Sequence, residues 1–225
     1  MDKVIIAIDG QASTGKSTQA KKIADHLGFK YRDSGAYYRA ITLYLLNSNV
    51  NHDLKISQEI LNQISIKQDY GEGNFRIFLN DDNVTNKIRG HKVSLNVSNY
   101  AKKPEIRKFV FDQLRNSAES NSIVVDGRDI GTKILPYANF KFFIDASIEI
   151  RARRRLLEKN ISFLHENDEK CMLQSLIREM KERDKLDSSR IISPLVPAVD
   201  AHVIDTSFID ADQLLLKVTK IIEGI

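Results

Sequence analysis

The stretch that decides the fold of this chain is Gly10-Gln11-Ala12-Ser13-Thr14-Gly15-Lys16-Ser17. The apolar run Val4–Ile8 precedes it, and a segment with helical spacing, Lys16–Leu27, follows it and stops before Gly28. The stretch matches G-x-x-x-x-G-K-[ST], a pattern whose backbone N–H groups surround phosphate when it joins a strand to a helix. The alternative is a glycine-rich turn without a ligand. The context favours a site for nucleotide phosphates.

Three side chains near this loop have the chemistry that a nucleoside triphosphate needs. Lys16 supplies a positive charge for the β- and γ-phosphates, and the Ser17 hydroxyl is a suitable ligand for Mg²⁺. Asp126 follows the apolar run Ile123–Val125 and is placed to help hold the same ion, although a strand-end residue needs no such role. We expect ATP to contact Gly10, Gln11, Ala12, Ser13, Thr14, Gly15, Lys16, Ser17 and Thr18.

Short apolar runs alternate with helical segments along the chain. Continuous apolar runs, as opposed to alternating ones, predict strands buried on both faces of a parallel sheet. We expect strands at Val4–Ile8, Ile123–Val125, Phe142–Ile144 and His202–Ile204, and helices at Lys16–Leu27, Ala36–Leu46, Pro104–Ser117 and Asp210–Ile222. The sequence therefore predicts an α/β P-loop fold, a doubly wound parallel sheet with helices on both faces.

Two segments depart from this alternation. Ser65–Gln68, Phe75–Leu79 and Asn83–Thr85 are joined by turn-rich links and predict a small antiparallel hairpin insert. The arginine-rich segment Arg151–Leu195 has helical spacing with a polar break at His165–Asp168, which we interpret as a helical lid. We expect a single domain with a core at about 1–33, 90–150 and 196–225, an insert at about 34–89 and a lid at about 151–195.

Composition limits the classes of function. The 225 residues are 42% hydrophobic, enough for one sizeable core, and the net charge of +4 is too small for a duplex nucleic-acid binder. Cys171 is the single cysteine, so the chain forms no internal disulfide, and its 5 histidines lack metal-ligand spacing. The run Val4–Ile8 is too short for a signal peptide or a membrane span. We expect a cytoplasmic monomer without nucleic-acid or membrane partners.

Other residues distinguish among phosphate-loop proteins. A guanine-specific GTPase carries an N-K-x-D element, whereas Asn86-Lys87-Ile88-Arg89 lacks the aspartate. Arginines near predicted strand ends and loop boundaries suit a second phosphorylated ligand, because a guanidinium group donates to phosphate through two parallel N–H groups. These arginines are Arg39, Arg107, Arg128, Arg183 and Arg190.

Three further motifs resemble those of the bacterial cytidylate kinase family, and the resemblance extends over nearly the whole chain. They are Asp33-Ser34-Gly35-Ala36-Tyr37-Tyr38-Arg39, Asp126-Gly127-Arg128-Asp129-Ile130-Gly131-Thr132 and Glu182-Arg183-Asp184, the last followed by Asp187, Arg190 and Pro194-Leu195-Val196-Pro197-Ala198. The resemblance implies a core, a monophosphate-binding insert and a mobile lid. It also implies transfer of phosphate from ATP, with Mg²⁺, to CMP and dCMP.

The resemblance assigns roles at the acceptor site. It places Ser34, Arg107, Asp129 and Arg190 around the cytosine, Arg39 and Arg128 at the CMP phosphate, and Ser98, Arg183 and Asp187 near the ribose. The Asp129 carboxylate would accept from the N4 amine of cytosine and repel the O4 carbonyl of uracil. The alternative is a network of structural ion pairs, such as Asp129 with Arg107 or Arg183 with Asp187.

Catalysis by such a protein depends on positive charge and alignment, because the attacking phosphate oxygen is already anionic. We expect Lys16, Ser17-bound Mg²⁺ and Arg128 to act with one or more lid arginines, namely Arg151, Arg154 and Arg155. Arg151 shares a helical face with the other two, since they lie three and four residues apart. The alternative for these three is a solvated basic face.

Several residues depart from the family pattern, and two rival functions share the phosphate loop. Gln11, Ser13 and Ser17 replace a proline, a glycine and a glycine of the common family loop, and Ser13 limits backbone freedom. Leu186 occupies a position where relatives can carry a charge. One rival is a shikimate- or gluconate-type hydroxyl kinase with Asp33 as the base. The other is a nucleotide-sensing module without catalysis.

Overall fold

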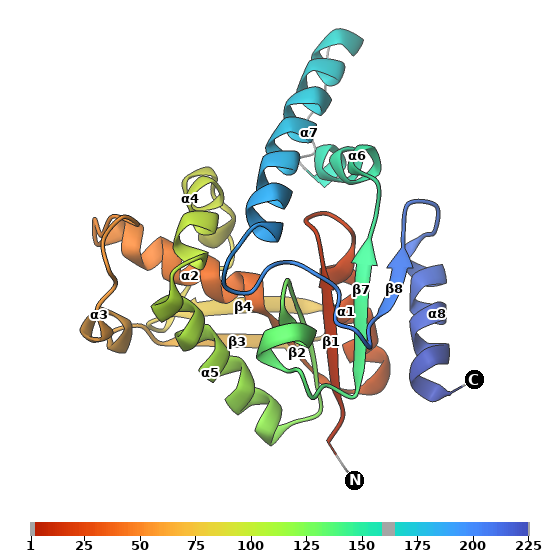
Figure 1. Ribbon diagram of the computed structural model, residues 1–225, viewed down its shortest axis with the longest axis horizontal. Helices are drawn as coiled ribbons and strands as arrows, with labels where there is room; N and C mark the ends of the chain where they lie inside the picture. Colours follow the sequence, from red (N-terminus) through yellow and green to blue (C-terminus); the bar gives the residue numbers. More distant parts are fainter. Residues whose placement is uncertain (1–2, 159–164, 225) are drawn as a thin grey trace.

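The computed structural model describes residues 3–158 and 165–224. The strands of the central sheet are β1 (Ile5–Gly10), β2 (Lys30–Asp33), β6 (Ile123–Gly127), β7 (Phe140–Asp145) and β8 (His202–Asp205). The helices that cover it are α1 (Lys16–Leu27), α2 (Ser34–Asn47), α5 (Pro104–Ser120) and α8 (Ala211–Glu223). The other elements are α3 (Gln58–Asn62), β3 (Ile66–Gly71), β4 (Asn74–Leu79), β5 (Asp82–Asn83), η1 (Lys87–Arg89), α4 (His91–Ala101), η2 (Ile130–Ile134), α6 (Ile148–Glu158) and α7 (Glu166–Ser188). Figure 1 shows these elements.

A parallel sheet of 5 strands in the order β2-β6-β1-β7-β8 forms the centre of the molecule. β1 lies between β6 and β7, with Ile8 opposite both Asp126 and Phe142. The prediction of a doubly wound parallel sheet is confirmed. The strand β2 was not predicted, because its four residues Lys-Tyr-Arg-Asp alternate in polarity and lie at the edge of the sheet.

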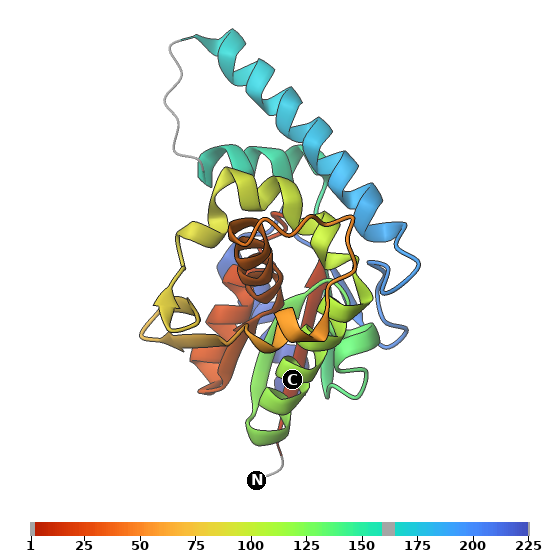
Figure 2. The same cartoon turned by 90° about the vertical axis from the view of Figure 1, so that its left-hand side faces the viewer.

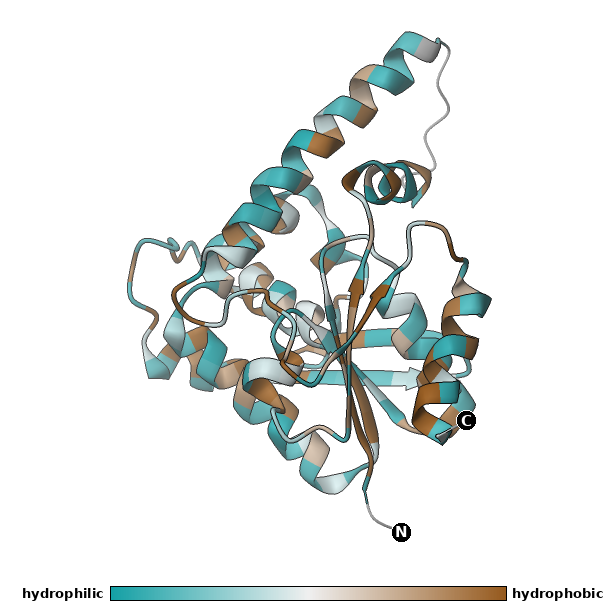
Figure 3. Cartoon of the chain, turned by 45° about the vertical axis from the view of Figure 1, so that its right-hand side comes forward, coloured by the Kyte–Doolittle hydropathy of each residue, from teal (hydrophilic) through white to brown (hydrophobic). Residues whose placement is uncertain are grey.

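Helices cover both faces of this sheet. On one face, α1 and α8 pack their apolar residues against Ile6, Ile8 and Phe142, and on the other face α2 and α5 pack against Ile5 and Ala7. Figure 3 shows the apolar strands at the centre between helices of mixed colour. Successive residues of β1 point to opposite faces, so a continuous apolar strand serves two cores.

The predicted hairpin insert is a three-stranded antiparallel sheet in the order β3-β4-β5. Gly71 pairs with Asn74 across a two-residue turn in which Glu72 and Gly73 have φ of 51° and 75°, as a type I′ turn requires. The prediction that the third strand reaches Thr85 is wrong. The strand ends at Asn83, whose side chain accepts from the Thr85 backbone N–H at 3.1 Å and turns the chain.

The helical pair α6 and α7 stands above the carboxyl end of the sheet. α7 extends well beyond the rest of the molecule, as Figures 1 and 2 show. Ala152 and Leu156 of α6 pack with Leu176 and Met180 of α7 in a small apolar cluster of their own. The predicted break at His165–Asp168 is wrong for residues 166–168, which form the first turn of α7. Asp168 adds negative charge there, which favours a helix start. Residues 159–164 lie outside the described part.

The four predicted helices are confirmed, with ends that coincide with the prediction or differ from it by one to three residues. Sequence spacing missed the helices α3 and α4 and the π-helix η2, which are short or flanked by polar residues. Gln68 of β3 bonds in both directions to the Asp33 backbone, at 2.9 and 2.7 Å, so the insert sheet is fastened directly to β2. The boundaries of core, insert and lid stay a prediction.

Candidate active site

The phosphate loop follows the carboxyl end of β1, where parallel sheets bind ligands. Gly10 passes so close to β7 that a Cβ atom there would lie 2.1 Å from the Ile144 carbonyl oxygen. Gly15 has φ of 89° and begins α1, and Ser13 also has a positive φ, 59°. A serine can adopt this conformation at an energetic cost, so the loop keeps its curvature without the family glycine.

Lys16 is buried under this loop, and its ammonium group donates to the Gln11 carbonyl oxygen at 2.9 Å. Burial, with the nearby positive charge of Arg128, lowers the pKa of Lys16 to about 7. The phosphates of a bound nucleotide would favour the protonated form again. A bound anion would therefore keep Lys16 in its charged ammonium form.

Ser17, in the first turn of α1, meets Asp126 near the carboxyl end of β6. The Ser17 hydroxyl donates to one Asp126 carboxylate oxygen at 2.6 Å, and the Tyr31 hydroxyl donates to the other at 2.7 Å. Burial, with the nearby charge of Asp33, raises the pKa of Asp126 to about 6. A hydroxyl and a carboxylate side by side are hard oxygen donors that suit Mg²⁺, so the residues fit the predicted metal.

Asp9 is a buried acid of the site that sequence reasoning missed. Its two carboxylate oxygens accept from the backbone N–H groups of Ile130 and Gly131, both at 2.8 Å. Burial raises the pKa of Asp9 to about 7. Because Asp9 immediately precedes Gly10, these bonds fasten the segment that carries Arg128 and Asp129 to the start of the phosphate loop.

The pair that the resemblance placed at the cytosine is buried across from this loop. Arg107 of α5 forms an ion pair with Asp129, and its guanidinium group also donates to the Ala101 carbonyl oxygen at 3.0 Å. Both side chains are 3% exposed. This is the ion pair named as the structural alternative for these residues; it is compatible with a binding role, and it holds the Asp129 carboxylate in one orientation.

Asp187, near the end of α7, joins the lid to the core. It accepts from Arg128 at 3.1 Å and forms a second ion pair with Arg190, and these arginines lower its pKa despite its burial. Within residues 3–158 and 165–224, the alternative ion pair of Asp187 with Arg183 is not formed, although Arg183 lies close enough to lower the same pKa.

An arginine cluster faces the space between α2, α6 and α7. Burial and neighbouring positive charge lower the pKa of both Arg39 and Arg183 to about 10, with Arg128 and Arg155 among the neighbours of each. Arg39 donates to the Ile88 carbonyl oxygen and the Ser94 hydroxyl, at 3.1 and 3.0 Å. Like charges gathered in this way lower their repulsion by binding an anion.

The three arginines predicted to act from the lid lie in different surroundings. Arg155 joins the arginine cluster. Arg151 is buried, forms an ion pair with Asp184 at 2.8 Å and lies 3.4 Å from the Ala12 carbonyl oxygen. Arg154 donates to carbonyl oxygens of Thr14 and Thr206, at 3.3 and 2.6 Å. Arg151 and Arg154 thus brace the outer side of the phosphate loop and do not lie on a solvated face.

A cavity of about 210 Å³ lies beside the loop, between α1 and α8. It is lined by residues that include Thr14, Gly15, Thr18, Arg154, Thr206 and Ile209. Its position next to the loop suits the nucleoside part of a donor nucleotide.

Two serines, Ser34 and Ser98, were also predicted to bind the acceptor nucleotide. Ser34 begins α2 and is so close to β6 that a Cβ atom on Gly127 would lie 2.4 Å from its hydroxyl oxygen. Ser98 is half-buried on α4, and no hydrogen bond of its side chain is present among the described residues. Leu186 is 54% exposed, in keeping with a position that contacts no ligand. Ion pairs, hydrogen bonds and neighbouring charges link most of the predicted residues to one site, and none of these contacts among the described residues involves the side chain of Ser98.

Comparisons with known proteins decide the family. The family model described as cytidylate kinase matches residues 6–224. This chain belongs to the cytidylate kinase family. Relatives named cytidylate kinase include one from Exiguobacterium sibiricum, 41% identical over 225 residues, covering 100% of this chain and 99% of the relative. Another, from Limosilactobacillus reuteri strain DSM 20016, is 43% identical over 219 residues, covering 97% of this chain and 94% of the relative.

The fold of this cytidylate kinase family member also has a solved counterpart. The crystal structure of an uncharacterized protein from Eubacterium ventriosum superimposes with a TM-score of 0.52 at 15% identity, covering 100% of both chains. At that identity the likeness concerns the fold alone. Within residues 3–158 and 165–224, no helix is long and apolar enough to cross a bilayer.

Proposed function

We propose that this protein transfers the γ-phosphoryl group of ATP to CMP and dCMP, giving ADP and CDP or dCDP. The observation that carries the proposal is the buried Asp129 carboxylate, fixed by Arg107 near the phosphate loop of a cytidylate kinase family chain. A fixed carboxylate accepts from the N4 amine of cytosine and disfavours the O4 carbonyl of uracil. Membership of a kinase family argues against a sensing module that transfers nothing.

The donor phosphates bind at the loop formed by residues 10–18. Lys16 exchanges the Gln11 carbonyl oxygen for phosphate oxygens, because an anion offsets the burial that lowers its pKa to about 7. Ser17 and Asp126 would hold Mg²⁺, which supplies charge neutralisation at the β- and γ-phosphates. Arg151 and Arg154 keep the loop curved through its carbonyl oxygens and so act behind the phosphates.

The acceptor phosphate binds at the arginine cluster. Arg39 and Arg128 come from opposite sides of this space and hold the CMP phosphate, whose oxygen attacks the γ-phosphorus as an anion and needs no general base. Arg155 and Arg183 come from the lid and compensate the charge that two polyanions bring together. Ser34 and Arg190 border the cytosine, and Ser98 and Asp187 border the ribose.

The oligomeric state and compartment belong to the same proposal. All the residues invoked come from one chain, so the protein can act as a monomer in the cytoplasm. Analytical ultracentrifugation at micromolar concentration, with and without CMP, tests the monomer.

An acceptor panel tests the function. With saturating ATP and Mg²⁺, a coupled assay for ADP should show turnover of CMP and dCMP well above that of UMP, AMP, shikimate and gluconate. Lys16→Ala measured in parallel controls for contaminating kinases. Turnover of shikimate or gluconate without CMP would replace the proposal with the hydroxyl kinase, in which Asp33 is the base.

A further inference from the structure

Tyr38 is a buried residue of α2 to which the proposed function gives no role. α2 begins at Ser34, and Tyr38 lies four residues later, so the two side chains share a face of the helix. Ser34 lies against Gly127, the residue before Arg128 and Asp129. The face that carries Tyr38 is thus directed toward the segment of the acceptor site.

The surroundings of Tyr38 are the residues proposed to bind cytosine. The guanidinium carbon of Arg107 lies 5.5 Å from the centroid of the Tyr38 ring, within the range of a cation–π contact. Arg107 in turn holds Asp129. The charges of Arg107, Asp129 and Arg190 all act on the Tyr38 hydroxyl. The ring therefore forms part of the wall of the acceptor site.

The hydroxyl of Tyr38 is unpaired, although the side chain is only 8% exposed. No residue in the described ranges 3–158 and 165–224 forms a hydrogen bond with it. Two other buried tyrosines have partners: Tyr31 donates to Asp126 and Tyr100 donates to the Val50 carbonyl oxygen, both at 2.7 Å. A buried hydroxyl without a partner costs stability, so its retention needs an explanation.

We propose that the Tyr38 hydroxyl donates a hydrogen bond to the pyrimidine base of the acceptor nucleotide, at one of its ring-edge acceptors O2 or N3. The inference rests on the proposed function and adds a recognition residue to it. Burial raises the pKa of Tyr38, so the hydroxyl stays protonated and can donate at neutral pH. The base would lie beside the paired side chains of Arg107 and Asp129 and give the unpaired Tyr38 hydroxyl its partner.

Tyr38→Phe separates this role from a structural one, because it should have two effects of opposite sign. Without nucleotide, the melting temperature should rise by about 2–6 °C, since a buried unpaired hydroxyl is removed. The Kd of CMP, measured by calorimetry, and its KM should rise about three- to tenfold, while the KM of ATP should change less than about twofold. Equal losses for CMP and UMP assign the bond to O2, and a loss for CMP alone assigns it to N3.

Tyr100→Phe is the matched control. It removes a hydroxyl that has a partner, so it should lower the melting temperature and leave the Kd of CMP unchanged. An unchanged Kd of CMP in Tyr38→Phe, or a melting temperature that falls as in the control, would overturn the inference. Wild-type protein that neither binds nor phosphorylates CMP would instead overturn the proposed function.

Discussion

Lys16 shows at the scale of one residue how burial and function are combined. Burial and the nearby charge of Arg128 both disfavour the protonated, charged form of its amine. The Gln11 carbonyl oxygen, which accepts a hydrogen bond from it, favours that form. An environment of this kind costs little reorganisation when phosphate arrives, because the cation is already in position.

Lys16→Ala tests that role. The ammonium group stabilises the charge that develops between the β- and γ-phosphates, so kcat should fall at least about a hundredfold. Steady-state kinetics with CMP and ATP measure it. Lys22→Ala is the matched control, because Lys22 lies on the same helix, is partly exposed and pairs with Asp212 at 2.5 Å. If Lys16→Ala keeps kcat within a few-fold of the wild type, Lys16 has no part in the transfer step.

Single residues were predictable where a motif fixes both identity and spacing. Lys16, Ser17 and Asp129 belong to such motifs, and the structure brings them to one site. Asp9 belongs to no such motif, and Tyr38 lies within the motif at residues 33–39 but has no assigned role there. Asp9 reads as the end of a strand, and its role arises from bonds to Ile130 and Gly131, 121 and 122 residues along the chain. Contacts of that range depend on the completed fold.

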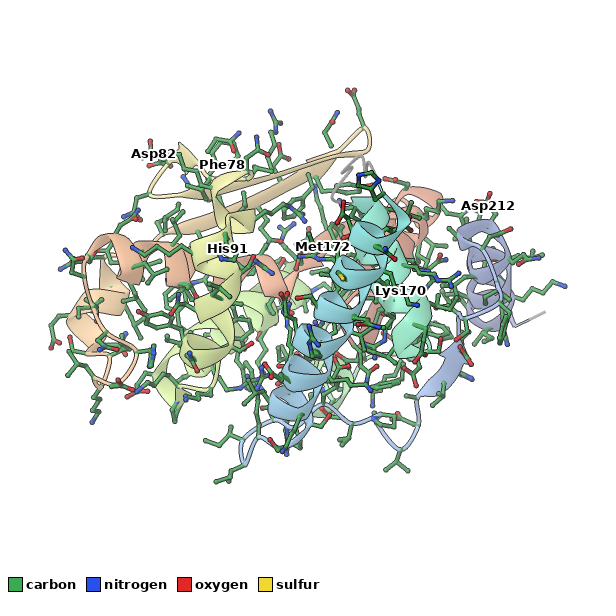
Figure 4. All side chains as sticks on the ribbon, turned by 90° about the horizontal axis from the view of Figure 1, so that it is seen from above. Phe78, Asp82, His91, Lys170, Met172 and Asp212 are labelled. Atoms are coloured by element: carbon green, nitrogen blue, oxygen red, sulfur yellow. The ribbon has the colours of Figure 1, made fainter. Side chains whose placement is uncertain are left out.

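At the scale of elements, the pair α6 and α7 is joined to the core by few side chains. Asp187 anchors the end of α7 to Arg128, and Arg151 of α6 reaches the outer side of the phosphate loop. Most of α7 is exposed, and Figures 1 and 2 show that it extends away from the core. Seen from above in Figure 4, Lys170 and Met172 of α7 lie between Phe78 of the insert and Asp212 of α8. An element with so few buried contacts opens at low free energy.

Closure of this lid should follow occupancy of both substrates, because its arginines need two sets of phosphates to offset their mutual repulsion. Amide hydrogen exchange across Arg151–Leu195 should slow with an analogue that joins ATP to CMP, and less with either nucleotide alone. Residues 112–120, at the end of α5, serve as an internal control, since they belong neither to the lid nor to the proposed nucleotide sites, and they should keep their exchange rate. Equal protection of the lid with and without the analogue would show that it is static.

Elements were predictable in proportion to their apolar periodicity. β1, β6, β7 and β8 carry apolar runs between helices, and these runs indicated the sheet. β2 is an edge strand with charged residues, and η2 is a π-helix whose bonds run from Ile134 and Leu135 back to Asp129 and Ile130. Neither pattern has a signature in a single sequence, so tertiary pairing decides both.

At the scale of the whole molecule, stability should depend on pH through Asp9. Its pKa is about 7 in the folded protein against an ordinary value of 3.8, so the folded state holds the proton more tightly. The contribution to stability is complete below pH 3.8 and is lost as pH rises to about 7, by up to about 1.4 kcal/mol per pH unit. Asp9 therefore favours the fold in acid.

Asp9→Asn isolates this contribution, because the amide keeps the shape of the side chain and does not titrate. Urea unfolding at pH 5, 6, 7 and 8 gives the free energy of unfolding of both proteins. The stability of the wild type minus that of the variant should fall between pH 5 and 7 and level off above about 7. A difference that is constant or rises with pH in this range contradicts the burial argument.

We propose that the Asp129 carboxylate gives the protein its preference for cytosine over uracil, and Asp129→Asn tests this role. Removing the carboxylate with alanine would leave the Arg107 charge buried without a partner, whereas asparagine keeps an oxygen for it. Circular dichroism confirms folding, and Asp200→Asn, which alters an aspartate paired with Lys141, is the matched control.

The measurement is kcat/KM for CMP and UMP with the wild type and Asp129→Asn. We predict that kcat/KM for CMP falls about ten- to a hundredfold, whereas kcat/KM for UMP falls much less or rises. The ratio of the CMP value to the UMP value should therefore approach unity. The KM of ATP should stay unchanged, because Asp129 pairs with Arg107 of α5 and is not one of the loop residues 10–18. A loss of the same factor for both acceptors would contradict the claim and leave Asp129 with a structural role.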